Sequence, residues 1–288
     1  MQRFFARIDQ SPTWSQFVPL TLTVVVLGGL LSILHASVYF LNMLPVREHI
    51  TIAIRWVDVL VGATIYLKTS IDFAILMGRL MATYPGWRGR VAIEIGTAIG
   101  NAAGTIAIIA IWVFFKDIHF LLAIMVFCAS LVLFELARGG LEHFSDWEGA
   151  GGIKKISYLT LHSLLESITK ITNPVISRVM PDLGANLQGK MGLTWMGLLL
   201  FSVSVPFILG LDDFAGYVPL FNVVNVYGFA IGVIGAHTIL NIALFLSPQR
   251  TITVVKNEYV SFVGTIAFIG LGIYGIVEAG KILFGLLF

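Results

Sequence analysis

The chain has 288 residues, of which 57% are hydrophobic and 12% are charged, and its formal net charge is +2. Ordinary soluble domains carry about 25% charged residues, so this composition excludes a typical soluble enzyme. A chain this apolar also cannot stay solvated as a disordered polymer. The small charge, with no long block of Lys and Arg, argues against a nucleic-acid partner. The lipid bilayer is therefore the expected solvent and partner.

Seven stretches are long enough to cross a membrane, which takes about 20 mostly apolar residues. They lie at 17–42, 54–83, 91–115, 118–137, 192–221, 223–246 and 259–286. The first is about twice as long as the apolar part of a signal peptide and lacks a clear cleavage site, so we expect an uncleaved helix. The single cysteine, Cys128, lies in an apolar run, where we expect a buried structural thiol. The sequence thus predicts an all-α integral membrane protein with seven transmembrane helices.

The orientation follows from the distribution of Lys and Arg, which are retained on the cytoplasmic side during insertion. With the N-terminus inside, thirteen of the 18 Lys and Arg residues fall in inner segments, three fall outside and two lie within the second span. We therefore expect a cytoplasmic N-terminus and an outer C-terminus. The absence of an organelle address favours the inner (cell) membrane of a prokaryote.

The spans suggest four parts. Residues 1–50 form an N-terminal cytoplasmic segment and an extra transmembrane helix, 51–137 a first three-helix repeat, 138–190 a cytoplasmic loop, and 191–288 a second three-helix repeat. Because three spans precede the loop and three follow it, the two groups enter the membrane from opposite sides, which predicts a 3+3 inverted repeat.

The cytoplasmic loop contains an amphipathic pattern. Apolar residues recur at helical spacing from Ile153 to Thr172, opposite charged residues, and we expect Pro174 to end the pattern. The pattern predicts an interfacial amphipathic helix. An ordinary linker helix without a regulatory role is the alternative, because periodicity reports only a face on which the helix can lie.

An Asp-Phe-Ala tripeptide occurs late in the first span of each repeat, at Asp72 and Asp213, 141 residues apart. An unpaired aspartate at the centre of a helix costs about 2.5 to 3.5 kcal/mol on insertion scales, so it is rare unless it faces a partner, an ion or water. Both spans are longer than a straight crossing needs, which is consistent with a tilt or a break near the acid. Pro206, Gly210 and Pro219 give the fifth span reasons to unwind.

The helix after each acid carries further polar residues beside a stripe of glycines. The combined candidates are hard oxygen ligands with one imidazole, namely Asp72, Asp213, Asp212, Glu94, Asn101, Asn241 and His237. Carboxylate and amide oxygens suit Mg²⁺, Ca²⁺ or Mn²⁺, and an imidazole admits Zn²⁺ or Cd²⁺. The alternatives are structural pairing of the acids with groups such as Lys68 or Arg79, and hydrogen bonding of the histidine across helices.

Two segments resemble elements of a known transporter group. Thr69-Ser-Ile-Asp72 and Gly210-Leu-Asp-Asp213, the latter followed by Tyr217-Val-Pro-Leu-Phe221, are similar to elements of the lysine-exporter superfamily, nearest the cadmium-resistance and tellurium-resistance families. The resemblance implies export of a divalent metal coupled to protons, with the paired acids as ligands. The chain departs from many members in having Phe after each Asp, and it lacks the Glu-x-Gly-Asp element of related calcium/manganese exchangers.

The expected function is a secondary transporter that exports a divalent metal cation (Mn, Cd, Zn or Ca) in exchange for protons. Two carboxylates brought close titrate as a pair, so cation release and proton uptake are linked. The cation and protons are then substrates, and no resident cofactor is expected. The lack of catalytic motifs argues against an enzyme. A transporter of a small organic solute such as an amino acid, with Arg55 or Lys68 for its carboxylate, and a non-transporting scaffold are the alternatives. A homo-oligomer is left open.

Overall fold

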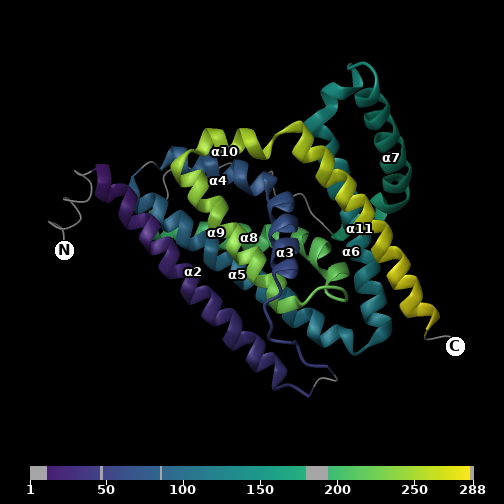
Figure 1. Ribbon diagram of the computed structural model, residues 1–288, viewed down its shortest axis with the longest axis horizontal. Helices are drawn as coiled ribbons and strands as arrows, with labels where there is room; N and C mark the ends of the chain where they lie inside the picture. The colour runs from purple at the N-terminus through teal and green to yellow at the C-terminus, as the bar shows by residue number, and fades with distance from the viewer. Residues whose placement is uncertain (1–11, 46–47, 85, 180–193, 286–288) are drawn as a thin grey trace. The chain divides into compact units, whose positions relative to one another are not determined.

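The computed structural model describes residues 12–45, 48–84, 86–179 and 194–285, without the side chains of 12, 72, 169, 171–179, 208–216 and 255. Every regular element in these ranges is a helix (Figure 1). The elements are α2 (Pro12–Asn42), α3 (Trp56–Thr69), α4 (Ile71–Thr83), α5 (Trp87–Lys116), α6 (His119–Leu141), the 3-10 helix η1 (Glu142–Glu148), α7 (Ile153–Val179), α8 (Trp195–Tyr217), the 3-10 helix η3 (Val218–Leu220), α9 (Val226–Leu246), α10 (Pro248–Val255) and α11 (Glu258–Phe284). The all-α prediction is thereby confirmed for the described residues.

Within the described residues, five helices are long and apolar enough to cross a membrane: α2, α5, α6 with η1, α9 and α11. Helices α3 and α4 pass the same test only as a pair, and they are bent by 67° at a short break. Helix α8 has 23 residues, and the apolar segment identified in it, Trp195–Phe207, ends where the described side chains end. These lengths fit a membrane protein, while the number of seven spans stays a prediction.

Two local expectations meet different outcomes. The expected break near Asp72 is found, because α3 ends at Thr69 and α4 begins at Ile71. The fifth span, which we expected to unwind at Pro206, Gly210 and Pro219, instead stays α-helical to Tyr217 and changes to the 3-10 helix η3 only around Pro219. A proline removes one backbone hydrogen bond, and a membrane helix tolerates this loss where neighbouring groups compensate.

Two further expectations are corrected. Helix α7 begins at Ile153 as predicted but continues past Pro174 to Val179, since a proline within a helix can bend it without ending it. Cys128 is exposed on α6 rather than buried. In a membrane helix the lipid-facing side is as apolar as the core, so an apolar run does not indicate which side of the helix is covered by protein.

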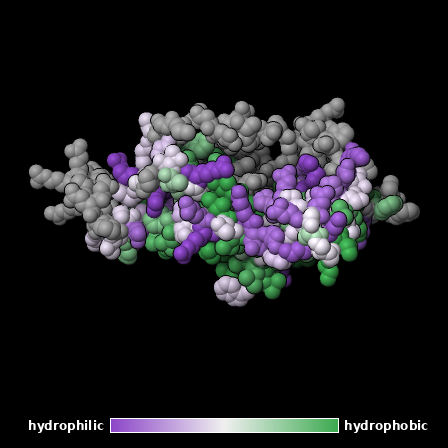
Figure 2. Space-filling view, turned by 90° about the horizontal axis from the view of Figure 1, so that it is seen from above, coloured by the Kyte–Doolittle hydropathy of each residue, from purple (hydrophilic) through white to green (hydrophobic). Residues whose placement is uncertain are grey.

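Large apolar side chains are exposed along the candidate spans. Val25 on α2 is 64% exposed and Val263 on α11 is 65% exposed, and lipid chains would cover such surfaces. Figure 2 looks from above the view of Figure 1 and shows hydrophilic residues gathered over much of that face, with apolar residues between them.

The helices group into two compact units, and each unit takes segments from both sides of the cytoplasmic loop. The first comprises Met1–Val113, Leu193–Leu211 and Val224–Thr253, and the second comprises Phe114–Gly192, Asp212–Val223 and Val254–Phe288. Both predicted repeats, 51–137 and 191–288, therefore contribute helices to both units. Neither unit can be completed by one half of the chain.

In the first unit, α3 and α9 lie side by side (Figure 1). A Cβ atom added at Gly228 would lie 3.1 Å from Cβ of Asp58 and 3.6 Å from the carbonyl oxygen of Arg55. A Cβ atom at Gly232, one turn later, would collide with the carbonyl oxygen of Val59. Because the contacts advance in the same direction along both helices, α3 and α9 are parallel.

Helices α5 and α8, also in the first unit, meet in the same manner. A Cβ atom at Gly96 would lie 2.8 Å from the carbonyl oxygen of Leu199 and 2.7 Å from Cβ of Ser202. A Cβ atom at Gly100 would collide with the carbonyl oxygen of Val203. The glycines thus let the two backbones touch, and α5 and α8 are parallel as well.

In the second unit, α6 and α11 form the most extensive helix contact. Gly140 of α6 lies against Thr265, and Gly272 of α11 lies against Phe134. Because residue numbers rise along one helix as they fall along the other, this pair is antiparallel.

The second unit also has an aromatic cluster where η1, α7 and α11 meet. Phe144 and Trp147 of η1 lie 5.8 and 5.0 Å from Phe262, measured between ring centroids. Nε1 of Trp147 and Nζ of Lys154 both donate to the carboxylate of Glu258, at 2.7 and 2.9 Å. This cluster attaches the start of α7 to the start of α11.

Candidate functional site

A polar stripe on α5 is buried inside the first unit. Glu94, Thr97, Asn101 and Thr105 are all buried, and the spacing of three and four residues puts them on one side of the helix. The glycine stripe next to them packs against α8. The polar stripe therefore faces the interior of the unit.

His237 of α9 lies in a line of hydrogen bonds that joins three helices. Its Nδ1 atom lies 2.5 Å from the hydroxyl oxygen of Tyr66 on α3. Its Nε2 atom lies 2.9 Å from Nδ2 of Asn241, and the same amide nitrogen donates to Oγ1 of Thr97 on α5 at 3.0 Å. The line therefore runs from α3 through α9 to α5.

The hydrogens along this line can be assigned by counting donors. The amide of Asn241 has two hydrogens and gives one to Thr97 and one to Nε2 of His237. Nε2 is then an acceptor, so the hydrogen of the neutral imidazole sits on Nδ1 and is donated to Tyr66. In this arrangement both ring nitrogens are engaged, and the histidine makes the cross-helix hydrogen bonds that stood as the alternative to metal binding.

The ring of His237 also touches both sides of the break between α3 and α4. The centroid of the imidazole lies 5.6 Å from the ring of Tyr66, before the break, and 5.4 Å from the ring of Phe73, after it. Phe73 directly follows Asp72 in the chain. A single side chain of α9 therefore contacts both segments of the bent helix.

Glu94 accepts a hydrogen bond from α2. The hydroxyl oxygen of Thr23 on α2 lies 2.7 Å from Oε2 of Glu94 and 3.0 Å from the carbonyl oxygen of Pro19. Glu94 is 2% exposed. Thr23 was not among the sequence candidates because α2 stands outside the predicted repeat. A hydroxyl in an apolar run gave the only signal, and hydroxyls often bond to their own helix.

The structure brings four of the predicted site residues together in the first unit and leaves the other three untested. Glu94, Asn101, His237 and Asn241 are buried on α5 and α9. The side chains of Asp72, Asp212 and Asp213 lie outside the described residues, although their backbones belong to α4 and α8.

No group of three or more His, Cys, Asp or Glu side chains that could hold a metal ion occurs among the described residues. The predicted ligand set contains four acids, and three of them lie outside that search. The metal-site prediction therefore stays a prediction.

Several buried polar atoms on these helices have no hydrogen-bond partner among the described residues. They are Oε1 of Glu94, Nδ2 of Asn101, Oδ1 of Asn241 and Oγ of Ser202. An unsatisfied buried polar group costs about 1 to 3 kcal/mol. Both donor and acceptor capacity is thus left unused inside the first unit.

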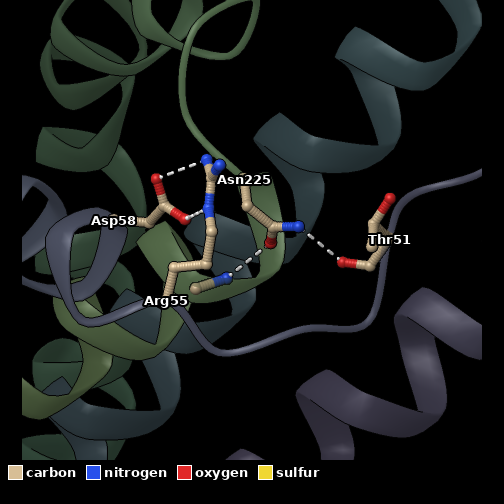
Figure 3. A network of polar contacts seen from close by, with 5 residues as sticks. Thr51, Arg55, Asp58 and Asn225 are labelled. Carbon is tan, nitrogen blue, oxygen red and sulfur yellow. Dashed lines mark hydrogen bonds and ion pairs between the residues drawn. The ribbon is translucent and has the colours of Figure 1, made fainter.

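Asp58 lies in the first turn of α3 and was not among the sequence candidates. In the structure Asp58 is 2% exposed and forms an ion pair with Arg55, with Nε and Oδ2 2.6 Å apart (Figure 3). Beside it, Asn225 accepts a hydrogen bond from the backbone of Gly228 and donates one to the carbonyl oxygen of Thr51 (Figure 3). This network fixes the starts of α3 and α9 next to each other.

Comparison with protein-family models, with curated proteins and with solved structures finds no match for the chain. The described residues form long apolar helices, a broken helix and a hydrogen-bonded polar line inside a helical unit. These features describe a helical membrane protein with a polar interior.

Proposed function

We propose that the protein is a secondary transporter of the prokaryotic cell membrane that exports a divalent metal cation in exchange for protons. Asp72 and Asp213 are the proposed ligands, with Asp212 next to them. The observation that carries the proposal is the reciprocal pairing of helices from the two halves of the chain.

The pairing is what an inverted repeat would produce. If α3–α4, α5 and α6 correspond to α8, α9 and α11, the contact of α3 with α9 must be repeated as a contact of α8 with α5. Both contacts occur, and both are parallel. A pair of equivalent helices related by a two-fold axis in the membrane plane must be antiparallel, as α6 and α11 are.

Helices α5 and α9 would also be equivalent, so they too must be antiparallel. Their contacts run in this direction. Thr97 of α5 meets Asn241 of α9, and Arg90, earlier on α5, lies 5.0 Å from the ring centre of Phe245, later on α9. The order along one helix is reversed along the other, so this pair is antiparallel too.

The two parallel contacts also correspond residue by residue. Leu199, Ser202 and Val203 occupy the places that Arg55, Asp58 and Val59 occupy in the other contact, 144 positions earlier. Likewise Gly96 and Gly100 correspond to Gly228 and Gly232. The matched glycine contacts support the 3+3 inverted repeat more strongly than the two Asp-Phe-Ala tripeptides do. The tripeptides are 141 positions apart, which differs from the offset of 144 by about one helical turn.

Inverted-repeat transporters bind their cargo where broken helices of the two halves meet. The break at Ser70 lies two residues before Asp72, and the polar line of Tyr66, His237, Asn241 and Thr97 passes beside it. Broken backbone and buried polar groups are tolerated in a membrane where they line a site. This placement supports Asp72 as a cargo ligand.

The test is cation flux and internal pH in proteoliposomes, with Mn²⁺, Cd²⁺, Zn²⁺ and Ca²⁺ offered one at a time. We expect flux of at least one cation with opposite proton movement in the wild type, and its loss in Asp72→Asn and Asp213→Asn. Glu278→Gln is the matched control, because this acid bonds to the exposed Lys281 within its own helix, and it should keep full flux.

The absence of flux for all four cations in folded wild type would overturn the proposal, as would flux that both aspartate variants retain. Lys68→Ala separates the proposal from transport of an organic anion. Removal of this positive charge should leave cation flux intact or raise it, whereas an anion site would lose its substrate.

A further inference from the structure

We propose that His237 is a positioning residue, which sets the bend between α3 and α4 and thereby the place of Asp72. The inference rests on the proposed function for the role of Asp72, but its geometric part stands on described contacts alone. It assigns His237 a role other than metal binding.

The bend needs support from outside its own helix. The segment contains no proline between Trp56 and Thr83, and proline is the usual cause of a sharp kink. The local contribution comes from Thr69, whose hydroxyl lies 3.2 Å from the carbonyl oxygen of Ile65 and 3.1 Å from that of Tyr66. Such bonds weaken a helix slightly and often bend it, but they do not choose one angle.

His237 supplies the missing constraint because it holds both arms. Tyr66 lies in the last turn of α3 and is hydrogen-bonded to Nδ1. Phe73 lies in the first turn of α4 and packs against the imidazole ring. Both side chains are buried, so neither contact competes with solvent. Moving α4 into line with α3 would break at least one of them.

The imidazole itself is held in place from the other side. Asn241 occupies Nε2, and the same amide is tied to Thr97 of α5. Helix α9 is packed directly against α3, because a Cβ atom at Gly62 would collide with the carbonyl oxygen of Phe229 and one at Gly232 with that of Val59. The ring therefore has a fixed position and a fixed orientation, as a positioning residue requires.

The bend can be measured with two spin labels, at Leu60→Cys on α3 and Ala82→Cys on α4, both exposed positions. The native Cys128 is exposed and is first replaced by Ser. At 1.5 Å per residue, the labelled positions would be about 33 Å apart in a straight helix and about 28 Å apart at the 67° bend. Straightening should lengthen the distance by about 5 Å.

We expect His237→Leu and Tyr66→Phe to shift the distance distribution to longer values. Thr238→Val is the matched control, because the hydroxyl of this neighbouring residue bonds to the carbonyl oxygen of Ile234 within α9, and it should leave the distance unchanged. If His237→Leu does not fold, the smaller Tyr66→Phe change decides the question.

Conservative variants provide a second criterion. In place of His237, the side-chain amide nitrogen of Asn would lie where Nδ1 of the imidazole lies. The amide nitrogen of the longer Gln would lie where Nε2 lies. His237→Asn should therefore keep the contact with Tyr66 and the short distance, whereas His237→Gln should not. Under the transport proposal, His237→Gln should also raise the KM for the cation more than it lowers kcat, because Asp72 is displaced.

An unchanged distance in both His237→Leu and Tyr66→Phe overturns the inference. A wild-type protein without cation flux overturns the transport proposal instead, since the label distance is measured without any substrate. The two failures are therefore distinguishable.

Discussion

The hydroxyl oxygen of Tyr66 lies 2.5 Å from Nδ1 of His237, although 171 positions separate the two residues in the chain. Tyr66 comes from α3 and His237 from α9. Their meeting depends on glycines that allow α3 and α9 to touch along their backbones. The strength of that helix contact is accordingly the first quantity to test.

Gly232→Ala should destabilise the protein strongly. The added Cβ would collide with the carbonyl oxygen of Val59, and overpacking of this kind costs about 1 to 3 kcal/mol. Gly235→Ala, three residues later on the same helix, has no atom within 4 Å of the added Cβ and should be near neutral. Thermal unfolding in detergent checks both, and equal midpoints for the two variants would contradict the contact.

The same substitution in α5 tests whether the two parallel contacts correspond. Gly100→Ala should lower the unfolding midpoint about as much as Gly232→Ala, since it meets the carbonyl oxygen of Val203 in the same way. Gly104→Ala is the control, because its nearest neighbour lies 3.9 Å away. A strong effect at one glycine and none at the other would argue against equivalence.

The positions of the helices were predictable from the sequence because hydropathy is a local property. Each predicted span overlaps a helix, and the spacing of the polar residues of α5 puts them on one side of that helix. Partners were not predictable. Thr23 and Asp58 gained their importance from contacts with Glu94 and Arg55, and no local pattern reports which hydroxyl a distant carboxylate will meet.

The hydrogen bond between Asn241 and Thr97 should contribute modestly to the free energy of unfolding. Interhelical hydrogen bonds in membrane proteins average about 0.6 kcal/mol in double-mutant cycles, with about 1.7 kcal/mol as the upper range. We expect a coupling energy in this range for Asn241→Leu combined with Thr97→Val, measured by reversible unfolding. Exact additivity of the two single changes would show that the side chains do not interact.

Thr23→Val should destabilise the first unit because it removes the donor to the buried carboxyl of Glu94. A buried polar atom left unsatisfied costs about 1 to 3 kcal/mol. Thr21→Val is the matched control, since that hydroxyl is exposed and bonds within α2 to the carbonyl oxygen of Phe17. Equal unfolding midpoints for the two valine variants would rule out a structural role for the contact between α2 and α5.

Glu258→Gln should loosen the start of α7 by weakening the hydrogen bonds from Trp147 and Lys154. Limited proteolysis should then cut α7 faster, whereas Glu166→Gln, an exposed acid on α7 itself, should leave the rate unchanged. A cutting rate equal to that of the wild type would mean that other contacts hold α7.

The contact between Lys154 and Glu258 should be lost at a defined alkaline pH. The hydrogen bond with Glu258 raises the pKa of Lys154 above its ordinary value of 10.5. The ammonium contact is therefore fully present below pH 10.5 and is lost as the pH rises through the raised value. Proteolysis of α7 should show no alkaline acceleration until that range, and an earlier rise would contradict the assignment.

Glu94 and Thr97 are neighbours on α5, but their partners arrive at different times during synthesis. Thr23 precedes Glu94 by 71 residues, whereas Asn241 follows Thr97 by 144 residues. A ribosome therefore delivers the donor for the buried acid before α5 emerges, so the carboxyl need not enter lipid alone. The line from α3 to α5 closes only when α9 has been inserted, which makes the late stages of translation the moment at which the polar interior is completed.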